Sequence, residues 1–126
     1  MPTSLVSHRD LLAVQLHPTG PLEITDGDPR AFDAALYRDE VVECGLWEVT
    51  PGAFLGENTR FGEYMYVLRG EGTVTSTNGA TLELRPGTSF VARPGWRGSW
   101  CVRETIRKIY VIWKMPTPPT GPEPHP

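Results

Sequence analysis

The stretch Thr59–Val74, TRFGEYMYVLRGEGTV, indicates two β-strands joined by a tight glycine turn. Its YMYVL segment has the aromatic and branched side chains typical of strands. Gly70 and Gly72 follow directly, and glycine is a usual residue of tight turns. We therefore expect a hairpin, with the carboxylate of Glu63 at the front edge of its first strand. Such a carboxylate suits a metal site, yet no histidine lies beside it.

Apolar and polar residues alternate with the strand period of two between residues 41 and 114. Within VVECGLWEV, residues 41–49, Trp47 shares one face with Gly45 and Val49. The dipeptide Asn78-Gly79 is a strong hairpin signal. Turn residues separate about seven or eight predicted strands, and no helical period interrupts them. We predict an all-β, single-domain, antiparallel jelly-roll β-barrel, which closes most strand edges.

The two ends of the chain differ from this barrel, which we assign to residues 41–114. Residues 1–40 are predicted to form an N-terminal arm and an edge strand. Asp28-Pro29 is a good helix start, but the following AALYR, residues 34–38, fits an outer strand equally well. Residues 115–126 form a Pro-rich C-terminal tail, expected to be extended. It is either a disordered end or a strap across a partner subunit.

Composition narrows the function classes. The 126 residues carry 12 basic and 15 acidic side chains without a basic block, so we expect no nucleic-acid partner. No apolar run approaches the roughly 20 residues of a membrane span, so we expect no membrane partner. The N-terminal segment lacks a secretory-signal pattern, which predicts a cytoplasmic protein. Cys44 and Cys101 match no zinc spacing and are predicted to be free thiols.

Three segments occur in an order and spacing shared with a known family: WEVTPGAF (47–54), GEYMYVLRGEGTVTSTNG (62–79) and LRPGTSFVARPGWRGSWCVRETIRKIYVI (84–112). Together they resemble the small single-domain cupins, in particular the ureidoglycine-aminohydrolase-like and ethanolamine-utilisation-like group. The resemblance covers about residues 26–114. It implies a jelly-roll β-barrel and commonly a homodimer.

The resemblance also implies positions for metal ligands, which in cupins at large are a His-x-His pair, a glutamate and a later histidine. Glu63, with its spacing to a following glycine, keeps the place of the glutamate. Counting back from it puts Glu57 and Thr59 at the histidine positions. Asn58 and Arg60 are the alternative occupants, because the count from the preceding glycine is one residue short.

The last ligand position falls on Gly98, which has no side chain and is expected to leave space. The three histidines, His8, His17 and His125, lie outside the predicted barrel strands. We therefore predict no tight transition metal and no cofactor, since such sites rely on imidazole or thiolate. Glu57 and Glu63 could hold a hard cation weakly. His8 or His17 reaching in from the arm stays open.

Strand alternation and the resemblance together predict a pocket inside the barrel. Glu63 faces inward with carboxylate chemistry, and aromatic side chains wall it. The predicted ligand-binding residues are Trp47, Glu57, Thr59, Met65, Arg97, Trp100 and Tyr110. Apolar walls with a few convergent polar groups are typical of small-molecule sites.

Two roles are open for Glu63. It is a general acid–base, because burial against tryptophans disfavours the charged form of a carboxylate, or it does no chemistry and instead pairs with an arginine or caps a backbone amide. The candidate counter-charges are Arg60, Arg93 and Arg97. For Arg107 and Lys108 we expect structural ion pairs.

Three functions follow from this sequence. The leading one is the binding of a small polar or anionic metabolite in the barrel of a homodimer, without a tight transition metal. The second is a metal-independent isomerase, lyase or hydrolase that uses Glu63 on a ureido or amino compound. The third is a non-catalytic dimeric interaction module whose barrel is a filled core without a cavity near Glu63.

Overall fold

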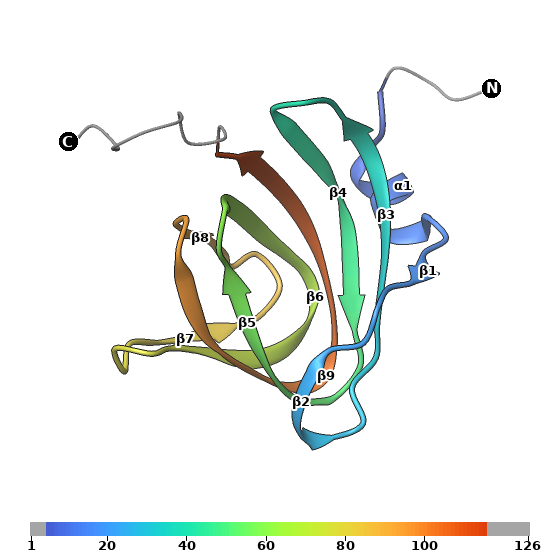
Figure 1. The fold of residues 1–126 in the computed structure, drawn as a ribbon. Helices are drawn as coiled ribbons and strands as arrows, with labels where there is room; N and C mark the ends of the chain where they lie inside the picture. The colour runs from blue at the N-terminus through green and yellow to red at the C-terminus, as the bar shows by residue number, and fades with distance from the viewer. Residues whose placement is uncertain (1–4, 116–126) are drawn as a thin grey trace, which may run out of the picture.

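The structure, a computed structural model, describes residues 5–115 and folds them into one helix and nine strands (Figure 1). The helix α1 spans His8–Ala13. The strands are β1 (His17–Pro18), β2 (Glu23–Gly27), β3 (Ala31–Arg38), β4 (Val42–Val49), β5 (Gly52–Asn58), β6 (Phe61–Ser76), β7 (Thr81–Leu84), β8 (Ser89–Ala92) and β9 (Trp96–Lys114). Every strand pairing is antiparallel. Over these residues, no helix has the length and apolarity that a membrane crossing requires.

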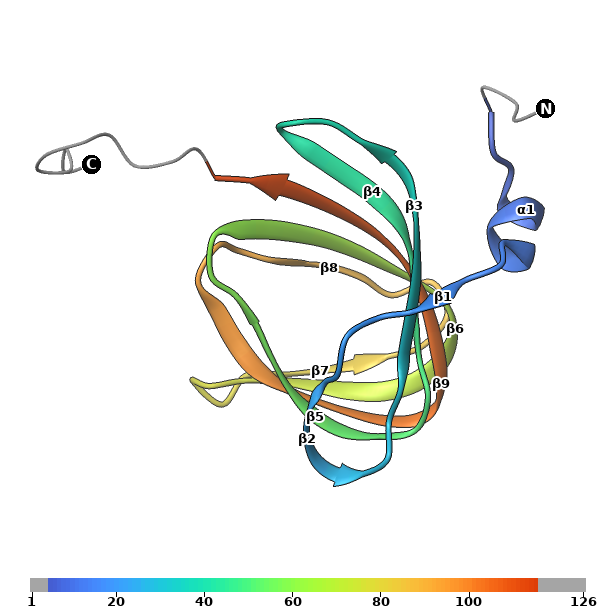
Figure 2. The ribbon, with the colours of Figure 1, turned by 45° about the vertical axis from the view of Figure 1, so that its right-hand side comes forward.

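Two long, bent strands, β6 and β9, join the sheets of the barrel (Figure 2). The C-terminal half of β9 pairs with β4 and with the first half of β6. Its N-terminal half pairs with β5 and with the second half of β6. β8 and β7 add to the two halves of β6, while β3 and β2 add to β4 and β5. Two curled sheets that share β6 and β9 make a jelly roll, so the predicted fold class is confirmed.

The strand count within the barrel is lower than predicted, with six strands between residues 41 and 114. The predicted hairpin in Thr59–Val74 is wrong, because β6 continues through Gly70. This glycine has a φ of 97°, and a Cβ there would overlap the carbonyl oxygen of Thr105 in β9. It therefore bends the strand where two backbones approach closely, instead of ending it. β9 is likewise a single long strand, of 19 residues.

The turn at Asn78-Gly79 joins β6 to β7, as its sequence indicates. Gly79 has a φ of 95°, which a glycine adopts readily. The side chain of Asn78 accepts a hydrogen bond from the backbone N–H of Ala80. This local chemistry fixes a tight turn without long-range contacts.

The N-terminal arm begins with α1, which packs outside the barrel (Figure 1). Ser7 caps the helix: its hydroxyl accepts from the N–H of Asp10, and the Asp10 carboxylate accepts from the N–H of Ser7. This reciprocal capping box stabilises a helix of only six residues. β1 then pairs two residues with β3 at the edge of the sheet.

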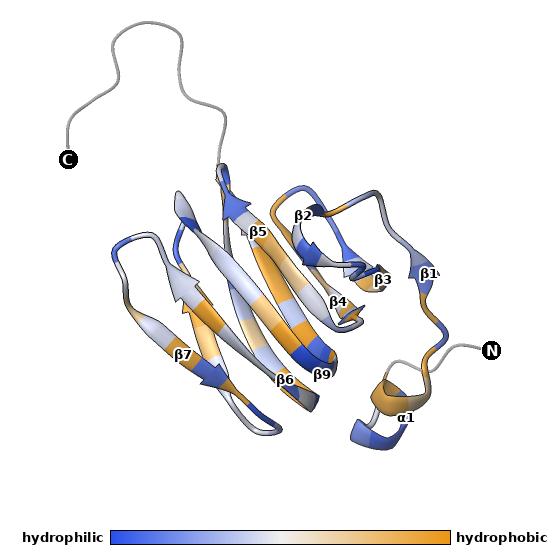
Figure 3. Ribbon diagram, turned by 90° about the horizontal axis from the view of Figure 1, so that it is seen from below, coloured by the Kyte–Doolittle hydropathy of each residue, from blue (hydrophilic) through white to orange (hydrophobic). Residues whose placement is uncertain are grey.

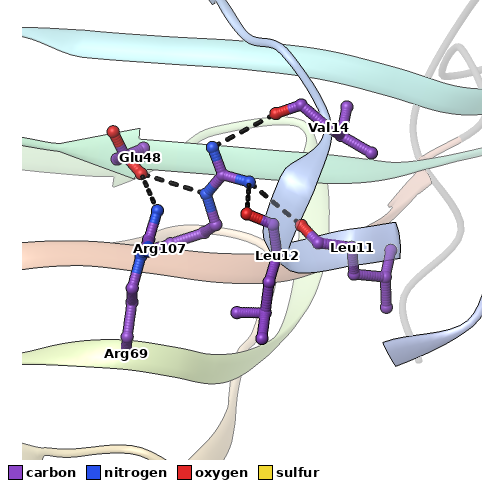
Figure 4. Close-up of polar contacts among 6 residues, drawn as sticks. All are labelled: Leu11, Leu12, Val14, Glu48, Arg69 and Arg107. Carbon is purple, nitrogen blue, oxygen red and sulfur yellow. Dashed lines mark hydrogen bonds and ion pairs between the residues drawn. The ribbon is translucent and has the colours of Figure 1, made fainter. Parts of the chain in front are cut away.

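One side chain of the barrel, Arg107 of β9, holds the C-terminal end of α1 (Figure 4). Its guanidinium donates to the carbonyl oxygens of Leu11 and Leu12 at 3.0 Å and of Val14 at 3.2 Å. It also donates to Glu48 of β4 at 3.0 Å. Because the last carbonyls of a helix have no partner within the helix, Arg107 both satisfies them and fixes the arm to the outer face of β4 and β9.

Of the two alternatives for residues 28–38, the structure has the strand. AALYR lies in β3, which pairs with β4, and no helix begins at Asp28. The Pro-rich tail, residues 116–126, lies outside the described residues. Both cysteines, Cys44 and Cys101, are free thiols.

Hydrophobic and hydrophilic residues alternate along the barrel strands (Figure 3). The core gathers the inward-facing side chains, and among the most deeply buried are Val49, Val67, Leu84 and Ile106. The four belong to β4, β6, β7 and β9. None of these four lines the cavity described below, whereas Phe54, Met65 and Trp100 belong both to the core and to the lining of that cavity.

Candidate functional site

A cavity of about 380 Å³ lies inside the barrel, lined by side chains from β2, β3, β4, β5, β6 and β9 and by Pro21 and Leu22 of the arm. Six of the eight predicted site residues line it: Trp47, Glu57, Glu63, Met65, Trp100 and Tyr110. This volume is within the usual range for small-molecule sites. A simple interaction module was expected to have a filled barrel without a cavity near Glu63, and this barrel has one.

Lys108 of β9 and Glu63 of β6 form a buried ion pair in this cavity. The Lys108 Nζ atom lies 2.9 Å from Glu63 Oε2, and the two side chains are 6% and 12% exposed. Two buried opposite charges at this distance offset part of the cost of removing each from water. The expected arginine partner of Glu63 is therefore wrong, whereas the structural ion pairs expected for Arg107 and Lys108 are found.

Aromatic and sulfur groups complete the surroundings of the ammonium. Lys108 Nζ is 4.6 Å from the ring centroid of Trp47 and 4.9 Å from that of Trp100. It also lies 2.9 Å from Met65 Sδ. The face of an indole attracts a cation, and more strongly where water is excluded. The two tryptophans meet edge to face at 5.7 Å, so they form a rigid wall behind Lys108.

A second polar group, made by Tyr110, Glu43 and Arg38, lies at another side of the cavity. The Tyr110 hydroxyl donates to Glu43 Oε2 at 2.7 Å, and Arg38 Nε donates to Glu43 Oε1 at 2.9 Å. The hydrogen bond from Tyr110, followed by that from Arg38, holds the pKa of Glu43 below its usual range. Burial, and then the bond to Glu43, raises the pKa of Tyr110. At neutral pH Glu43 is therefore ionised and Tyr110 neutral.

Asn58 contributes the one buried side-chain atom without a hydrogen-bond partner within the described part of the chain. The residue is 7% exposed, it lines the cavity, and its Nδ2 atom has no acceptor. A buried donor without a partner costs free energy, about 1–3 kcal/mol. Buried groups of this kind need an explanation, and a bound molecule is one.

Two predicted site residues do not line the cavity. Thr59 is exposed in the bend after β5, and Arg97 lies outside the lining. Arg97 instead pairs with Glu57 at 2.9 Å, with side chains 70% and 48% exposed. The Thr59 prediction came from counting back from Glu63, which cannot tell where β5 ends and its connection to β6 begins. Arg97 was predicted as a counter-charge for Glu63, but its partner is Glu57.

Gly98 leaves no space for a ligand, contrary to the expectation. A Cβ at this position would overlap the ring of Trp96 and the carbonyl oxygen of Thr75. The Trp96 indole packs over the glycine, and its Nε1 donates to Ser76 Oγ at 2.8 Å. The position at which the family has a histidine is therefore filled by an aromatic ring from two residues earlier.

The side chains present do not fit the metal that the cupin resemblance implies. Glu63 is paired with an ammonium, and Glu57 with a guanidinium. His8 lies in α1 and His17 in β1, both exposed. Within residues 5–115, no group of three His, Cys, Asp or Glu side chains gathers in a way that could hold a metal ion.

The sequence reasoning missed Lys108 and Asn58 as cavity residues. Lys108 is two residues before Tyr110, so the parity that put Tyr110 inside also puts Lys108 inside. Asn58 was considered only as an alternative occupant of a metal-ligand position. Glu43 and Trp96 were also missed, and both lie two positions along a strand from a residue predicted or found to face inward.

Comparisons with solved structures show the fold. The EutQ protein of Clostridium difficile gives a TM-score of 0.61 at 19% identity, over 68% of this chain and 69% of that protein. The cupin domain of Schizosaccharomyces pombe Cnp3 gives 0.65 at 18% identity, over 82% and 71%. A Pseudomonas syringae protein of unknown function gives 0.72 at 20% identity, over 85% of this chain. The chain spans about half, 46%, of that last protein.

The family comparison shows the family as well as the fold, because it is made on the sequence itself. No curated protein sequence matches the chain. The family described as the EutQ-like cupin domain matches residues 36–110, which is more than half of the chain. That range contains β4 to β8, the last three residues of β3, most of β9, and the Glu63–Lys108 pair. The chain belongs to the EutQ-like cupin domain family.

Proposed function

We propose that this cupin binds a small polar metabolite in its barrel. The observation that carries the proposal is the Asn58 amide, a buried donor without a partner, in the same cavity as the Lys108–Glu63 pair. A ligand with an acceptor atom at Asn58 removes the cost of the unmade hydrogen bond. The aromatic walls of Trp47 and Trp100 supply apolar contact, as in most small-molecule sites.

A thermal-shift screen of small polar metabolites tests the proposal, since a molecule that binds only the folded protein raises its melting temperature. Asn58→Leu is the informative variant. It removes the unsatisfied donor, so we expect the melting temperature of the free protein to stay equal or rise, while the ligand-induced shift is lost. Thr59→Val, next along the chain and outside the cavity, is the control and should keep the shift. A wild type that no metabolite stabilises, or an Asn58→Leu protein with an unchanged response, contradicts the proposal.

A metal-independent isomerase, lyase or hydrolase acting on a ureido or amino compound is the second candidate, and the Glu63–Lys108 pair favours it. Glu63 can accept a proton from a substrate, while the adjacent ammonium stabilises negative charge that develops on a substrate oxygen. Incubating the stabilising ligand with the protein and analysing it by mass spectrometry and NMR tests this candidate. Turnover by the wild type and none by Glu63→Gln supports it; a ligand recovered unchanged contradicts it.

The homodimer and the cytoplasmic location stay predictions. The cavity beside Glu63 argues against the filled barrel of a pure interaction module. Light scattering on the purified protein measures the oligomeric state directly.

A further inference from the structure

The charge of the cavity lining narrows the ligand class, and this inference rests on the proposed function. Five carboxylates line the cavity, Glu23, Asp33, Glu43, Glu57 and Glu63, against one cationic side chain, Lys108. We infer that the ligand carries an ammonium group together with a carbonyl or carboxylate acceptor, and that it is not a simple anion.

Several of the lining charges are already neutralised within the protein. Glu63 pairs with Lys108, Glu57 with Arg97, and Glu43 with Arg38. Over residues 5–115, by contrast, neither Glu23 nor Asp33 forms an ion pair with a cationic side chain. Asp33 is half-buried on β3, close enough to Tyr110 and Arg38 to affect both electrostatically. The remaining charge of the cavity is therefore negative, and a cleft of one sign concentrates ligands of the opposite sign.

The ionisation states of Glu43 and Tyr110 at neutral pH agree with a cavity whose remaining charge is negative. The Tyr110 hydroxyl and Arg38 lower the pKa of Glu43, so its carboxylate stays charged. Tyr110 itself stays neutral, because burial and Glu43 raise its pKa. The side of the cavity made by Asp33, Glu43 and Tyr110 thus offers acceptor oxygens, which suit the N–H groups of an ammonium.

The cavity walls already stabilise one ammonium. Lys108 Nζ is held between a carboxylate and the faces of Trp47 and Trp100, at 4.6 and 4.9 Å. Phe54, Phe61 and Trp96 extend the aromatic lining beyond these two rings. A second cation in the same cavity meets aromatic faces and unpaired carboxylates, the two groups that favour it.

The cavity also contains hydrogen-bond donors, and these determine the acceptor group that the ligand needs. Asn58 Nδ2 has no acceptor, and an ammonium such as that of Lys108 carries three N–H donors. An acceptor atom on the ligand satisfies the amide. A simple anion would satisfy it too, but it meets one ammonium, already paired with Glu63, in a cavity whose unpaired charges are negative. The arrangement therefore favours a zwitterion or an amino amide over a simple carboxylate or phosphate.

Three probes of equal carbon number separate these alternatives: 4-aminobutanoate, butanoate, which lacks the amine, and butylamine, which lacks the carboxylate. We expect 4-aminobutanoate to raise the melting temperature of the wild type most, and butanoate to raise it least. Asp33→Asn should weaken the binding of 4-aminobutanoate by about three- to fivefold, the value of a partly exposed ion pair. Asp26→Asn makes the same change in net charge at an exposed position of β2 outside the cavity and should leave binding unchanged.

These binding results test the inferred ammonium group of the ligand separately from the proposed small-molecule site. If butanoate binds as tightly as 4-aminobutanoate and Asp33→Asn has no effect, the ammonium requirement is overturned. The proposed site for a polar ligand is not affected by that result. No response to either amine probe also overturns the inference, and the proposed function then depends on the Asn58→Leu experiment alone. Weaker binding of 4-aminobutanoate in added salt further supports the inference, because salt screens partly exposed charges.

Discussion

Arg107 and Lys108 are consecutive residues of β9 whose side chains contact opposite sides of the sheet. Arg107 donates to three carbonyl oxygens of the N-terminal arm and to Glu48 on the outside (Figure 4). Lys108 lines the cavity and pairs with Glu63 on the inside. Successive side chains of a strand alternate between faces, so one dipeptide serves both the arm and the cavity.

Replacing Arg107 should release the arm. Arg107→Met removes a guanidinium that is 7% exposed and leaves the carbonyls of Leu11, Leu12 and Val14 without their donor. We expect the free energy of unfolding to fall by about 2–4 kcal/mol, the cost of removing one partner from a buried charged network. Hydrogen exchange, read by mass spectrometry, should become faster in residues 8–18 than in the barrel strands.

Arg103→Met is the matched control for this change, because Arg103 lies on the same strand but is half-exposed. It pairs with Glu83 and Thr73 at the surface. The control should leave the exchange of the arm unchanged. An arm that stays protected in Arg107→Met would show that β1 pairing, not Arg107, holds it.

The period-two pattern predicts the inner face of the barrel well where a strand is regular. Trp47, Met65, Trp100 and Tyr110 all line the cavity, as alternation and the cupin resemblance predicted. Lys108 follows from the same parity, and the ion pair predicted for it is found, but its place in the cavity and its partner Glu63 were not predicted. A charged residue on an inward position is expected to be paired when buried, and its partner comes from a distant strand that the local pattern cannot identify.

Breaking the buried pair from one side should cost much more than removing it entirely. Lys108→Met leaves Glu63 without a counter-charge, and we expect a loss of about 3–5 kcal/mol in the free energy of unfolding. The double variant Lys108→Met, Glu63→Leu should recover at least half of that loss, because it buries no charge. Urea unfolding of the four proteins of the cycle measures the coupling.

The exposed pair Arg97–Glu57 is the comparison for this cycle. Its atoms are at the same distance, 2.9 Å, but its side chains are 70% and 48% exposed. We expect a coupling of less than about 1 kcal/mol there. Equal couplings in the two cycles would contradict the burial of the Lys108–Glu63 pair.

The bends of β6 and β9 could not be predicted from local sequence. Gly70 and Gly72 have the composition of a turn, but a glycine with positive φ also allows a bend inside a strand. The choice between the two depends on the close approach to Thr105, a residue far along the chain. The same holds for Gly98, whose missing side chain makes room for the Trp96 ring and not for a ligand.

Gly98→Ala tests this packing. The added Cβ overlaps the Trp96 ring and the Thr75 carbonyl, so a ring or a strand must move. We expect a loss of about 1–3 kcal/mol in the free energy of unfolding, typical of overpacking, together with a change in tryptophan fluorescence.

Gly20→Ala is the control, because nothing lies within 4 Å of its Cβ position. It should be neutral or slightly stabilising. An equally neutral Gly98→Ala would mean that Trp96 does not need the bare glycine.

The hydrogen bond between Tyr110 and Glu43 should make stability depend on pH at both ends of the scale. The pKa of Glu43 is lowered from its usual 4.5, so its stabilisation is present above that pH and is lost as the pH falls through the folded-state pKa. The pKa of Tyr110 is raised from 10.0, so its stabilisation is present below pH 10.0 and is lost as the pH rises further. Tyr110→Phe removes the titration of Tyr110 and its share in lowering the pKa of Glu43, while Arg38 still lowers that pKa. We expect the variant to be less stable than the wild type by about 1.5–3 kcal/mol near neutral pH, the value of a hydrogen bond to a charged group. Melting curves followed by circular dichroism should show this difference shrinking below pH 4.5 and above pH 10.0. A difference that stays constant across the whole range would mean that the bond does not form in solution.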